Sequence, residues 1–220
     1  MKNISKIDIN GIPFYVRDYS RQDESVLRKG IETNNYQLPD SMEGLTVVDI
    51  GAFIGGISIL CAKRGATVYC AEPSKDNFRL LLKNIKLNSL EERIYASRVA
   101  LGESKNTHHF TRLIDINHSN RASNVLRGLS NSASRVNETE RVSIQTLKEF
   151  FSLRGIKKCD ILKMDCEGAE IELLDDIVEM QIPLIVCELH FRNISNAFDE
   201  KLSMYLKTAL GGCDIKYTHL

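Results

Sequence analysis

Five short apolar runs rich in β-branched residues alternate with helix-like stretches along this sequence of 220 residues. Strands that are apolar on both faces are typical of a parallel sheet covered by helices on both sides. The pattern therefore predicts an α/β fold with a mostly parallel sheet. The expected strands are residues 45–50, 66–72, 93–101, 159–165 and 182–189.

The two ends of the chain carry signals of their own. Alternating residues flank Asn10-Gly11, which predicts a two-residue β-hairpin. Residues 22–34 predict a helix, so we expect residues 1–44 to form an N-terminal cap on a main domain of residues 45–220. A helix at about 198–210 and a strand at 213–219 are expected to close the chain.

A polar region, residues 102–146, separates the third and fourth expected strands and is rich in Ser, Asn, His and Arg. Its ends, "HHFTRL" and "RVSIQTL", are expected to pair as strands. Long loops in compact domains often serve as functional covers. This insertion is the candidate element for covering a substrate.

Composition limits the classes of partner. Lys plus Arg and Asp plus Glu both number 29, so the chain lacks the basic excess that favours a nucleic-acid partner. No apolar run approaches the ~18 residues of a membrane span, and the N-terminus lacks the apolar core of a signal peptide. The six cysteines form no CxxC pair, so we expect a reducing, cytoplasmic setting.

A glycine turn follows the first expected strand, in "VVDIGAFIGGIS" (47–58). In doubly wound sheets the ligand lies at the carboxyl ends of the strands, where glycine lets the backbone approach it and the next helix offers free N–H groups. The dinucleotide pattern GxGxxG is not met, because position 53 is Phe. Glu72 ends the second strand, where an acid can accept hydrogen bonds from ribose hydroxyls. A nucleoside cofactor is indicated; NAD and S-adenosylmethionine (SAM) both stay open, and the missing pyrophosphate cradle favours SAM.

With this turn, the later motifs "VALGE", "VSIQTL", "DILKMDCEGAEIELL" and "IVCELH" occur in an order that resembles the FkbM-type SAM-dependent methyltransferases over roughly residues 45–190. The resemblance implies a Rossmann-like methyltransferase fold, SAM as cofactor, and O-methylation of a saccharide or secondary-metabolite hydroxyl. It differs at Phe53, where Asn is commoner, and at Gly56, where a larger residue is usual. The antiparallel seventh strand of that fold has no clear candidate. The cofactor positions that the resemblance implies are Asp49, Gly51, Ala52 and Gly55 in the turn, Glu72 for the ribose, and Ala100 and Leu101 near the adenine.

Acidic residues follow the fourth and fifth expected strands, at the edge where the glycine turn lies. Alternation along "ILKMDCE" sends Ile161, Lys163 and Asp165 to one face. The candidate catalytic residues are Asp165, Glu167, Glu188 and His190. A carboxylate here could take the proton of an acceptor hydroxyl. Alternatively, Asp165, Glu188 and His190 could hold Mg²⁺ or Mn²⁺.

These acids also have structural interpretations. Asp165 could be a helix N-cap and Glu167 a first-turn acid. We expect a solvated helix face for the acids Glu170, Glu172, Asp175 and Asp176. Three other functions are considered. A tRNA methyltransferase would need a basic face and a motif such as NPPY, and a nicotinamide-dependent oxidoreductase would carry a Tyr-x-x-x-Lys signature, which is missing. The third is a protein of this fold that binds a partner without catalysis. The acceptor and the oligomeric state are not encoded in any motif.

Overall fold

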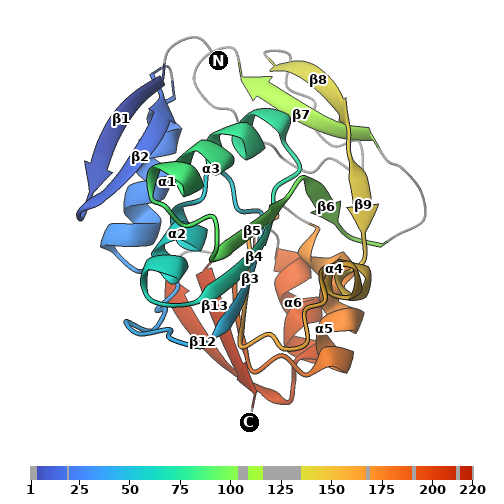
Figure 1. The fold of residues 1–220 in the computed structure, drawn as a ribbon. Helices are drawn as coiled ribbons and strands as arrows, with labels where there is room; N and C mark the ends of the chain where they lie inside the picture. The colour runs from blue at the N-terminus through green and yellow to red at the C-terminus, as the bar shows by residue number, and fades with distance from the viewer. Residues whose placement is uncertain are drawn as a thin grey trace.

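A seven-stranded sheet forms the centre of the molecule, as a computed structural model shows (Figure 1). The structure describes residues 4–18, 20–103, 109–115, 135–166, 169–189, 192–211 and 214–219. The strands follow the order β12-β13-β11-β10-β3-β4-β5. Their bounds are β3 (Thr46–Ile50), β4 (Thr67–Ala71), β5 (Ile94–Ser97), β10 (Ile161–Met164), β11 (Leu184–Glu188), β12 (Tyr205–Gly211) and β13 (Asp214–His219). Strands β5, β4, β3, β10 and β11 pair in parallel, which confirms the expected α/β class.

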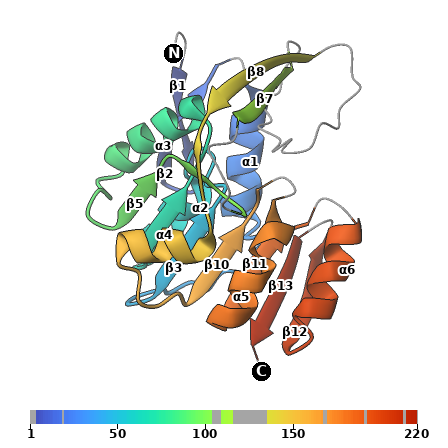
Figure 2. The same ribbon diagram turned by 90° about the vertical axis from the view of Figure 1, so that its right-hand side faces the viewer.

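Helices cover both faces of this sheet (Figures 1 and 2). Neighbouring residues Val47 and Val48 belong to two different hydrophobic cores, because successive side chains of a strand point to opposite faces. The helices on the Val47 face are α1 (Arg21–Glu32), α2 (Gly56–Lys63) and α3 (Lys75–Leu87). Those on the Val48 face are α4 (Leu147–Arg154), α5 (Leu174–Met180) with a preceding 3₁₀ turn (Glu170–Leu173), and α6 (Arg192–Lys201).

The C-terminal end differs from the expected helix and single strand. Helix α6 ends at Lys201, and the residues after it form strand β12 instead of continuing the helix to about 210. Strand β13 is the expected strand at 213–219, and it runs antiparallel between β11 and β12. The strand without a candidate in the sequence is β12, which completes the seven-stranded sheet. The segment from Leu202 onward has apolar residues at spacings that suit helix and strand alike, and pairing with β13 decides between them. The Tyr205 ring contacts the His219 ring edge-on at a centroid distance of 4.9 Å.

The N-terminal hairpin forms as expected, with β1 (Ile4–Ile9) and β2 (Ile12–Arg17) joined at Asn10-Gly11. Both turn residues have positive φ, 52° and 79°, which is the geometry of a type I′ turn. Hairpin residues such as Phe14 and α1 residues such as Leu27 are buried in the same core as the α1–α3 face of the sheet. The hairpin and α1 therefore share a core with the main sheet.

Two small separate sheets lie within or next to the polar region. β6 (Val99–Leu101) pairs in parallel with β9 (Ser143–Gln145), so the expected strand 93–101 is divided between β5 and β6. β7 (His109–Asp115) pairs antiparallel with β8 (Arg135–Arg141). Residues 109–113 of "HHFTRL" thus pair with residues 137–141, and the expected pairing with "RVSIQTL" is wrong except at the shared Arg141. Residues 104–108 and 116–134 of the insertion lie outside the described residues.

Candidate cofactor and acceptor site

The glycine turn lies against the end of strand β10. Gly51 has φ +76°, and a Cβ placed on it would lie 1.9 Å from the carbonyl oxygen of Asp165. The amide N–H groups of Gly51 and Ala52 both donate to the carbonyl oxygen of Ala71, each at 3.0 Å. Gly55 has φ +98° and caps α2. Only glycine fits Gly51, because the backbone conformation and the contact with β10 both exclude a side chain.

The two positions that depart from the family pattern have local explanations. Phe53 adopts φ +52°, in the left-handed region where Asn is better tolerated than a bulky residue, so this turn is strained. The Phe53 ring lies 5.5 Å from the guanidinium carbon of Arg17. A Cβ on Gly56 would lie 2.8 Å from Leu27 of α1, so glycine allows the cap helix to approach α2 closely.

A buried ion pair lies next to the glycine turn and supports its backbone. Asp49 of β3 is opposite Lys163 of β10 in the parallel register, and Lys163 Nζ lies 3.0 Å from Asp49 Oδ1. Lys163 Nζ also donates to the Gly51 carbonyl oxygen at 2.9 Å, and Ser58 Oγ donates to Asp49 Oδ2 at 2.6 Å. Burial alone would lower the pKa of Lys163, but the charges of Asp49 and Asp165 outweigh it and raise that pKa, so the lysine is charged. Asp49 is completely buried and supports the turn through Lys163 and Ser58.

Glu72 ends strand β4 and is 4% exposed. Its Oε2 accepts from the Phe53 N–H at 2.9 Å, and its Oε1 accepts from Ser74 N–H at 2.8 Å and from Asn77 Nδ2 at 3.3 Å. Burial raises the pKa of Glu72 to about 7 despite these bonds, which favour the charged form. Among described residues, Oε2 accepts one hydrogen bond, so this oxygen can accept another from a ligand.

A cavity of about 680 Å³ opens between the cap and the carboxyl ends of β3, β10 and β11. This volume lies within the ~300–1,000 Å³ typical of small-molecule sites. The residues that line it come from α1 and the segment after it, from the glycine turn and α2, and from the strand ends: Arg21, Gln22, Ser25, Val26, Leu27, Lys29, Gly30, Asn35, Tyr36, Gly51, Ala52, Phe53, Gly56, Ile57, Lys163, Asp165 and Glu188. Glu72, Gly55, Ala100 and Leu101 are not among them.

Two of the candidate catalytic acids lie at this cavity, Asp165 after β10 and Glu188 at the end of β11. Lys29 of α1 reaches across, with Nζ 3.4 Å from Glu188 Oε2 and 3.1 Å from Asp214 Oδ2. Tyr36 also lines the cavity, and burial, then the charges of Asp165 and Glu188, raise its pKa well above the usual value. The expected alternation is confirmed, since Ile161 packs in one core and Leu162 and Met164 in the other.

Other sequence-derived candidates lie elsewhere. Glu167 and His190 lie outside the described residues. Ala100 and Leu101 are buried in β6, where Ala100 packs with Val142. Among the described residues, no group of three or more His, Cys, Asp or Glu side chains could hold a metal ion.

The prediction of a solvated face for the acids after β10 is wrong for Glu170. This residue is fully buried, and its Oε1 accepts from the Cys166 N–H at 2.8 Å, so it caps the backbone that follows Asp165. Asp175 is exposed, as expected. Glu172 is partly buried, with Oε2 accepting from Glu103 N–H at 3.0 Å. Asp176 is also partly buried, 3.4 Å from Lys148 Nζ.

Sequence reasoning missed the polar residues that connect the cap to the turn. Asn77 and Asn84 are buried in α3, seven residues apart and therefore on the same face as the apolar residues Leu80 and Leu81. Asparagine on the apolar face of a helix was the available signal, because a buried amide needs partners. Arg17 and Lys29 carried no such signal, since most lysines and arginines are exposed.

Comparison with known proteins decides the family. Residues 49–210 match the family described as the methyltransferase FkbM domain. The chain belongs to this family. It is therefore a SAM-dependent methyltransferase, and the resemblance carried by its motifs is confirmed.

More distant similarities agree with this fold. Part of the chain is 36% identical over 77 residues to protein arginine N-methyltransferase 6 of Danio rerio, a match that covers 32% of this chain and 22% of that protein. A precorrin-6Y C5,15-methyltransferase of Geobacter metallireducens superposes with a TM-score of 0.51 at 12% identity, covering 93% of this chain and 92% of that one. A SAM-dependent methyltransferase of Agrobacterium tumefaciens superposes with a TM-score of 0.50 at 13% identity, covering 92% of this chain and 59% of that one. At these identities the two superpositions show the shared fold.

Proposed function

We propose that this FkbM methyltransferase methylates a hydroxyl group of a saccharide or small secondary metabolite bound in the cavity beside Asp165. One observation carries this proposal: the cavity is lined both by the glycine turn and by the carboxylates Asp165 and Glu188. A cofactor held by the turn and an acceptor held by the acids would therefore share one space. The methyl group would pass between them without crossing solvent.

The residues of the turn fit SAM. Gly51, Ala52 and Phe53 bring backbone to the cavity, and Glu72 Oε2 has the capacity to accept a ribose hydroxyl. We assign Gly51, Ala52 and Gly55 to the cofactor loop and Glu72 to the ribose. Asp49 acts indirectly, through Lys163. Ala100 and Leu101 stay proposed for the adenine end, which lies away from this cavity.

The chemistry needs a proton acceptor and a good alignment. When bound, SAM supplies an electrophilic methyl group whose bond to sulfur breaks as the acceptor oxygen attacks. We propose that the Asp165 carboxylate, which lines the cavity beside the turn, accepts the proton of the acceptor hydroxyl. Glu188, held by Lys29, would accept a hydrogen bond from a second hydroxyl and so orient the acceptor. Glu167 and His190 follow the same two strands in sequence and stay proposed as supporting residues.

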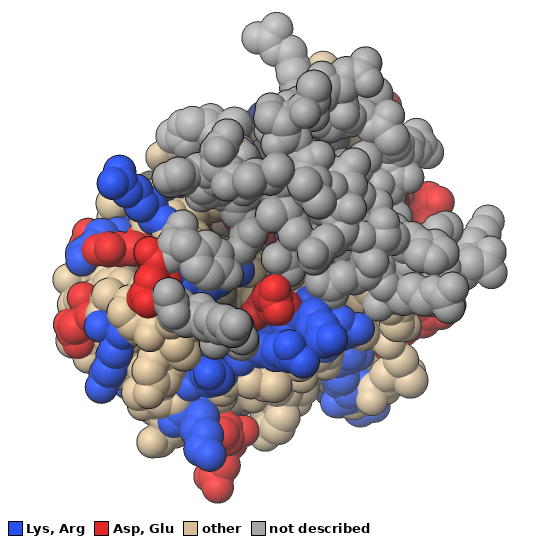
Figure 3. All heavy atoms as spheres, turned by 90° about the horizontal axis from the view of Figure 1, so that it is seen from above, with Lys and Arg blue, Asp and Glu red and all other residues tan. Residues whose placement is uncertain are grey.

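The cavity lining favours a small polar acceptor over a nucleic acid. It combines carboxylates with amide, hydroxyl and cationic side chains, which suit a molecule with several hydroxyls. On the described part of the face seen in Figure 3, Lys and Arg side chains lie among Asp and Glu side chains. A nucleic-acid site would be expected to show a continuous basic surface. Within the described ranges, no helix combines the length and apolar character that crossing a bilayer requires.

The setting that we propose is the cytoplasm. Five cysteines of the described residues are free thiols, and four of these are buried. Free thiols persist in a reducing compartment.

Two measurements test the proposal. Calorimetry should show that the protein binds SAM, and a screen of hydroxylated metabolites with labelled SAM should yield a methylated product. The screen is run with and without EDTA, because a divalent metal held by Asp165, Glu188 and His190 is an alternative way to acidify the hydroxyl. Methyl transfer to nitrogen, or to RNA alone, would contradict the acceptor assignment and leave the cofactor assignment intact.

A further inference from the structure

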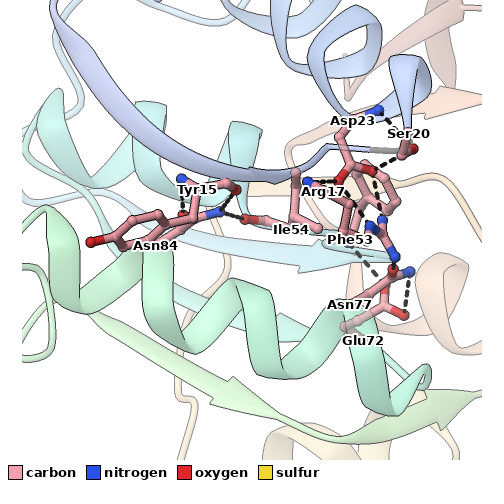
Figure 4. A network of polar contacts seen from close by, with 9 residues as sticks. All are labelled: Tyr15, Arg17, Ser20, Asp23, Phe53, Ile54, Glu72, Asn77 and Asn84. Carbon is pink, nitrogen blue, oxygen red and sulfur yellow. Dashed lines mark hydrogen bonds and ion pairs between the residues drawn. The ribbon is translucent and has the colours of Figure 1, made fainter. Parts of the chain in front are cut away.

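A buried chain of polar side chains runs from the N-terminal cap to the cofactor side of the sheet (Figure 4). It begins with Arg17, the last residue of β2, which is 2% exposed. The Arg17 guanidinium forms two bonds to the carboxylate of Asp23, Nη2 to Oδ1 at 2.6 Å and Nε to Oδ2 at 2.8 Å. Ser20, the N-cap of α1, also donates to Asp23. The cap thus neutralises its own buried charge.

The third guanidinium nitrogen of Arg17 contacts a residue of helix α3, outside the cap. Arg17 Nη1 donates to Asn77 Oδ1 at 3.0 Å, and Asn77 Nδ2 donates to Glu72 Oε1 at 3.3 Å. An amide between a cation and a carboxylate has one orientation that satisfies both, with its oxygen toward the cation and its nitrogen toward the acid. The charge of Arg17 therefore fixes how Asn77 presents its donor to Glu72.

A second connection lies two helical turns along α3. Asn84 is completely buried, and its Oδ1 accepts from the Tyr15 N–H of β2 at 2.7 Å. Its Nδ2 donates to the Tyr15 carbonyl oxygen at 3.2 Å and to the Ile54 carbonyl oxygen at 2.9 Å. Both asparagines therefore contact strand β2 on one side and the cofactor side on the other, Asn84 through the glycine turn and Asn77 through Glu72.

From these contacts we propose that Arg17, Asn77 and Asn84 are positioning residues that make the N-terminal cap part of the SAM site. The proposal rests on the assignment of Glu72 to the cofactor ribose. Arg17 and Asn77 hold the Glu72 carboxylate, and Asn84 holds the turn at Ile54, so that Glu72 Oε2 stays directed at the ribose. The family match begins at residue 49, so the cap's share in this site lies outside it.

A purely structural role would also explain buried, paired polar groups, and the test must separate the two. Asn77→Asp is the informative change, because the aspartate can still accept from Arg17 and so keep the cap attached. It loses the donor to Glu72 and places a second carboxylate against it. We expect the SAM dissociation constant to rise about tenfold or more, since a hydrogen bond to a charged group is lost and a like charge is added.

The decisive readout compares S-adenosylhomocysteine with its 2′,3′-dideoxy analogue. In the wild-type protein, removal of the ribose hydroxyls should weaken binding, and in Asn77→Asp the difference between the two ligands should shrink toward onefold. Equal losses for both ligands in the variant would mean a structural role only and would overturn the proposal. Unchanged affinity of the variant for SAM would overturn it as well.

Asn88 provides the matched control. Its Nδ2 also connects the end of α3 to the hairpin, through the Pro13 carbonyl oxygen at 2.9 Å. Among the described residues, its hydrogen bonds reach neither Glu72 nor the turn. Asn88→Ala should keep wild-type affinity for both ligands, and a loss equal to that of Asn77→Asp would refute the specific role of Asn77. If the wild-type protein itself does not bind SAM, the proposed function fails; if it binds SAM and the variant ratios do not differ, only this inference fails.

Discussion

The carboxylates on the two sides of the glycine turn differ in burial and in their hydrogen-bond partners. On the cap side, Glu72 and Asp23 are buried and receive donors from within the chain. On the cavity side, Asp165 and Glu188 line an open space, and the partner of Glu188, Lys29, has a side chain that is 47% exposed. A buried charge is costly unless it is paired, so the cap side is fixed by its own partners. The cavity side is left adjustable, which suits a group that must exchange partners with a substrate.

The largest effect on activity is expected for a substitution on the cavity side. Asp165→Asn keeps the shape of the side chain and removes its ability to take a proton, so turnover should fall by about 10²–10⁴-fold, the usual contribution of a general base. SAM affinity measured by calorimetry should change little. Normal turnover in this variant would show that Asp165 only orients the acceptor or lies outside the chemistry.

Breaking the buried Asp49–Lys163 ion pair next to the glycine turn should lower the stability of the protein. Lys163→Met leaves the buried Asp49 carboxylate without its cation, which should lower the free energy of unfolding by about 3–5 kcal/mol. Urea denaturation followed by circular dichroism measures this. The double variant Asp49→Asn/Lys163→Met is the control and should recover part of the loss. A single variant as stable as wild type would mean that water, not Lys163, satisfies Asp49.

The cap side should show a pH dependence. Because the pKa of Glu72 is raised to about 7 from 4.5, the native protein holds one more proton than the unfolded chain between these values. The contribution of this group to the free energy of unfolding should therefore fall as pH rises from about 4.5 to 7, by up to about 3 kcal/mol. Glu72→Gln should lack this slope in denaturation curves recorded across that range. The same slope in both proteins would assign it to other groups.

The smallest effect is expected for the cation that borders the cavity. Lys29→Gln removes a partly exposed cation from Glu188 and Asp214. Asp214 keeps the hydrogen bond from Asn35 Nδ2, so stability should change by about 1 kcal/mol or less. The KM for the acceptor should change while the SAM dissociation constant does not, because Glu188 faces the acceptor in our proposal. Lys207→Gln is the control, because it breaks an exposed pair with Asp199 and neither residue lines the cavity. A change in SAM affinity would place Lys29 on the cofactor side.

The part of this arrangement that the sequence predicted follows from local periodicity and turn chemistry. The parallel strands, the Asn10-Gly11 hairpin and the position of Asp165 at a strand end all follow from alternation or from glycine. The tertiary contacts did not follow. Strand β12 depends on pairing with β13, and the burial of Glu170 depends on the backbone of Cys166. The connection of Arg17 to Asn77 joins residues 60 apart in sequence, which no local pattern reports.

The contact between helices α1 and α2 limits how this enzyme can be recombined with its relatives. Cβ atoms added at Gly30 and at Gly56 would each lie 2.8 Å from a side chain of the facing helix, Ile57 and Leu27 respectively. The two helices therefore interlock through a matched pair of glycines. A foreign N-terminal segment with a larger residue at the position of Gly30 would have to repack the side chain of Ile57, which lines the cavity. Under the proposed function, exchanging the first 44 residues should therefore reshape the cavity beside the glycine turn as well as replace the cap.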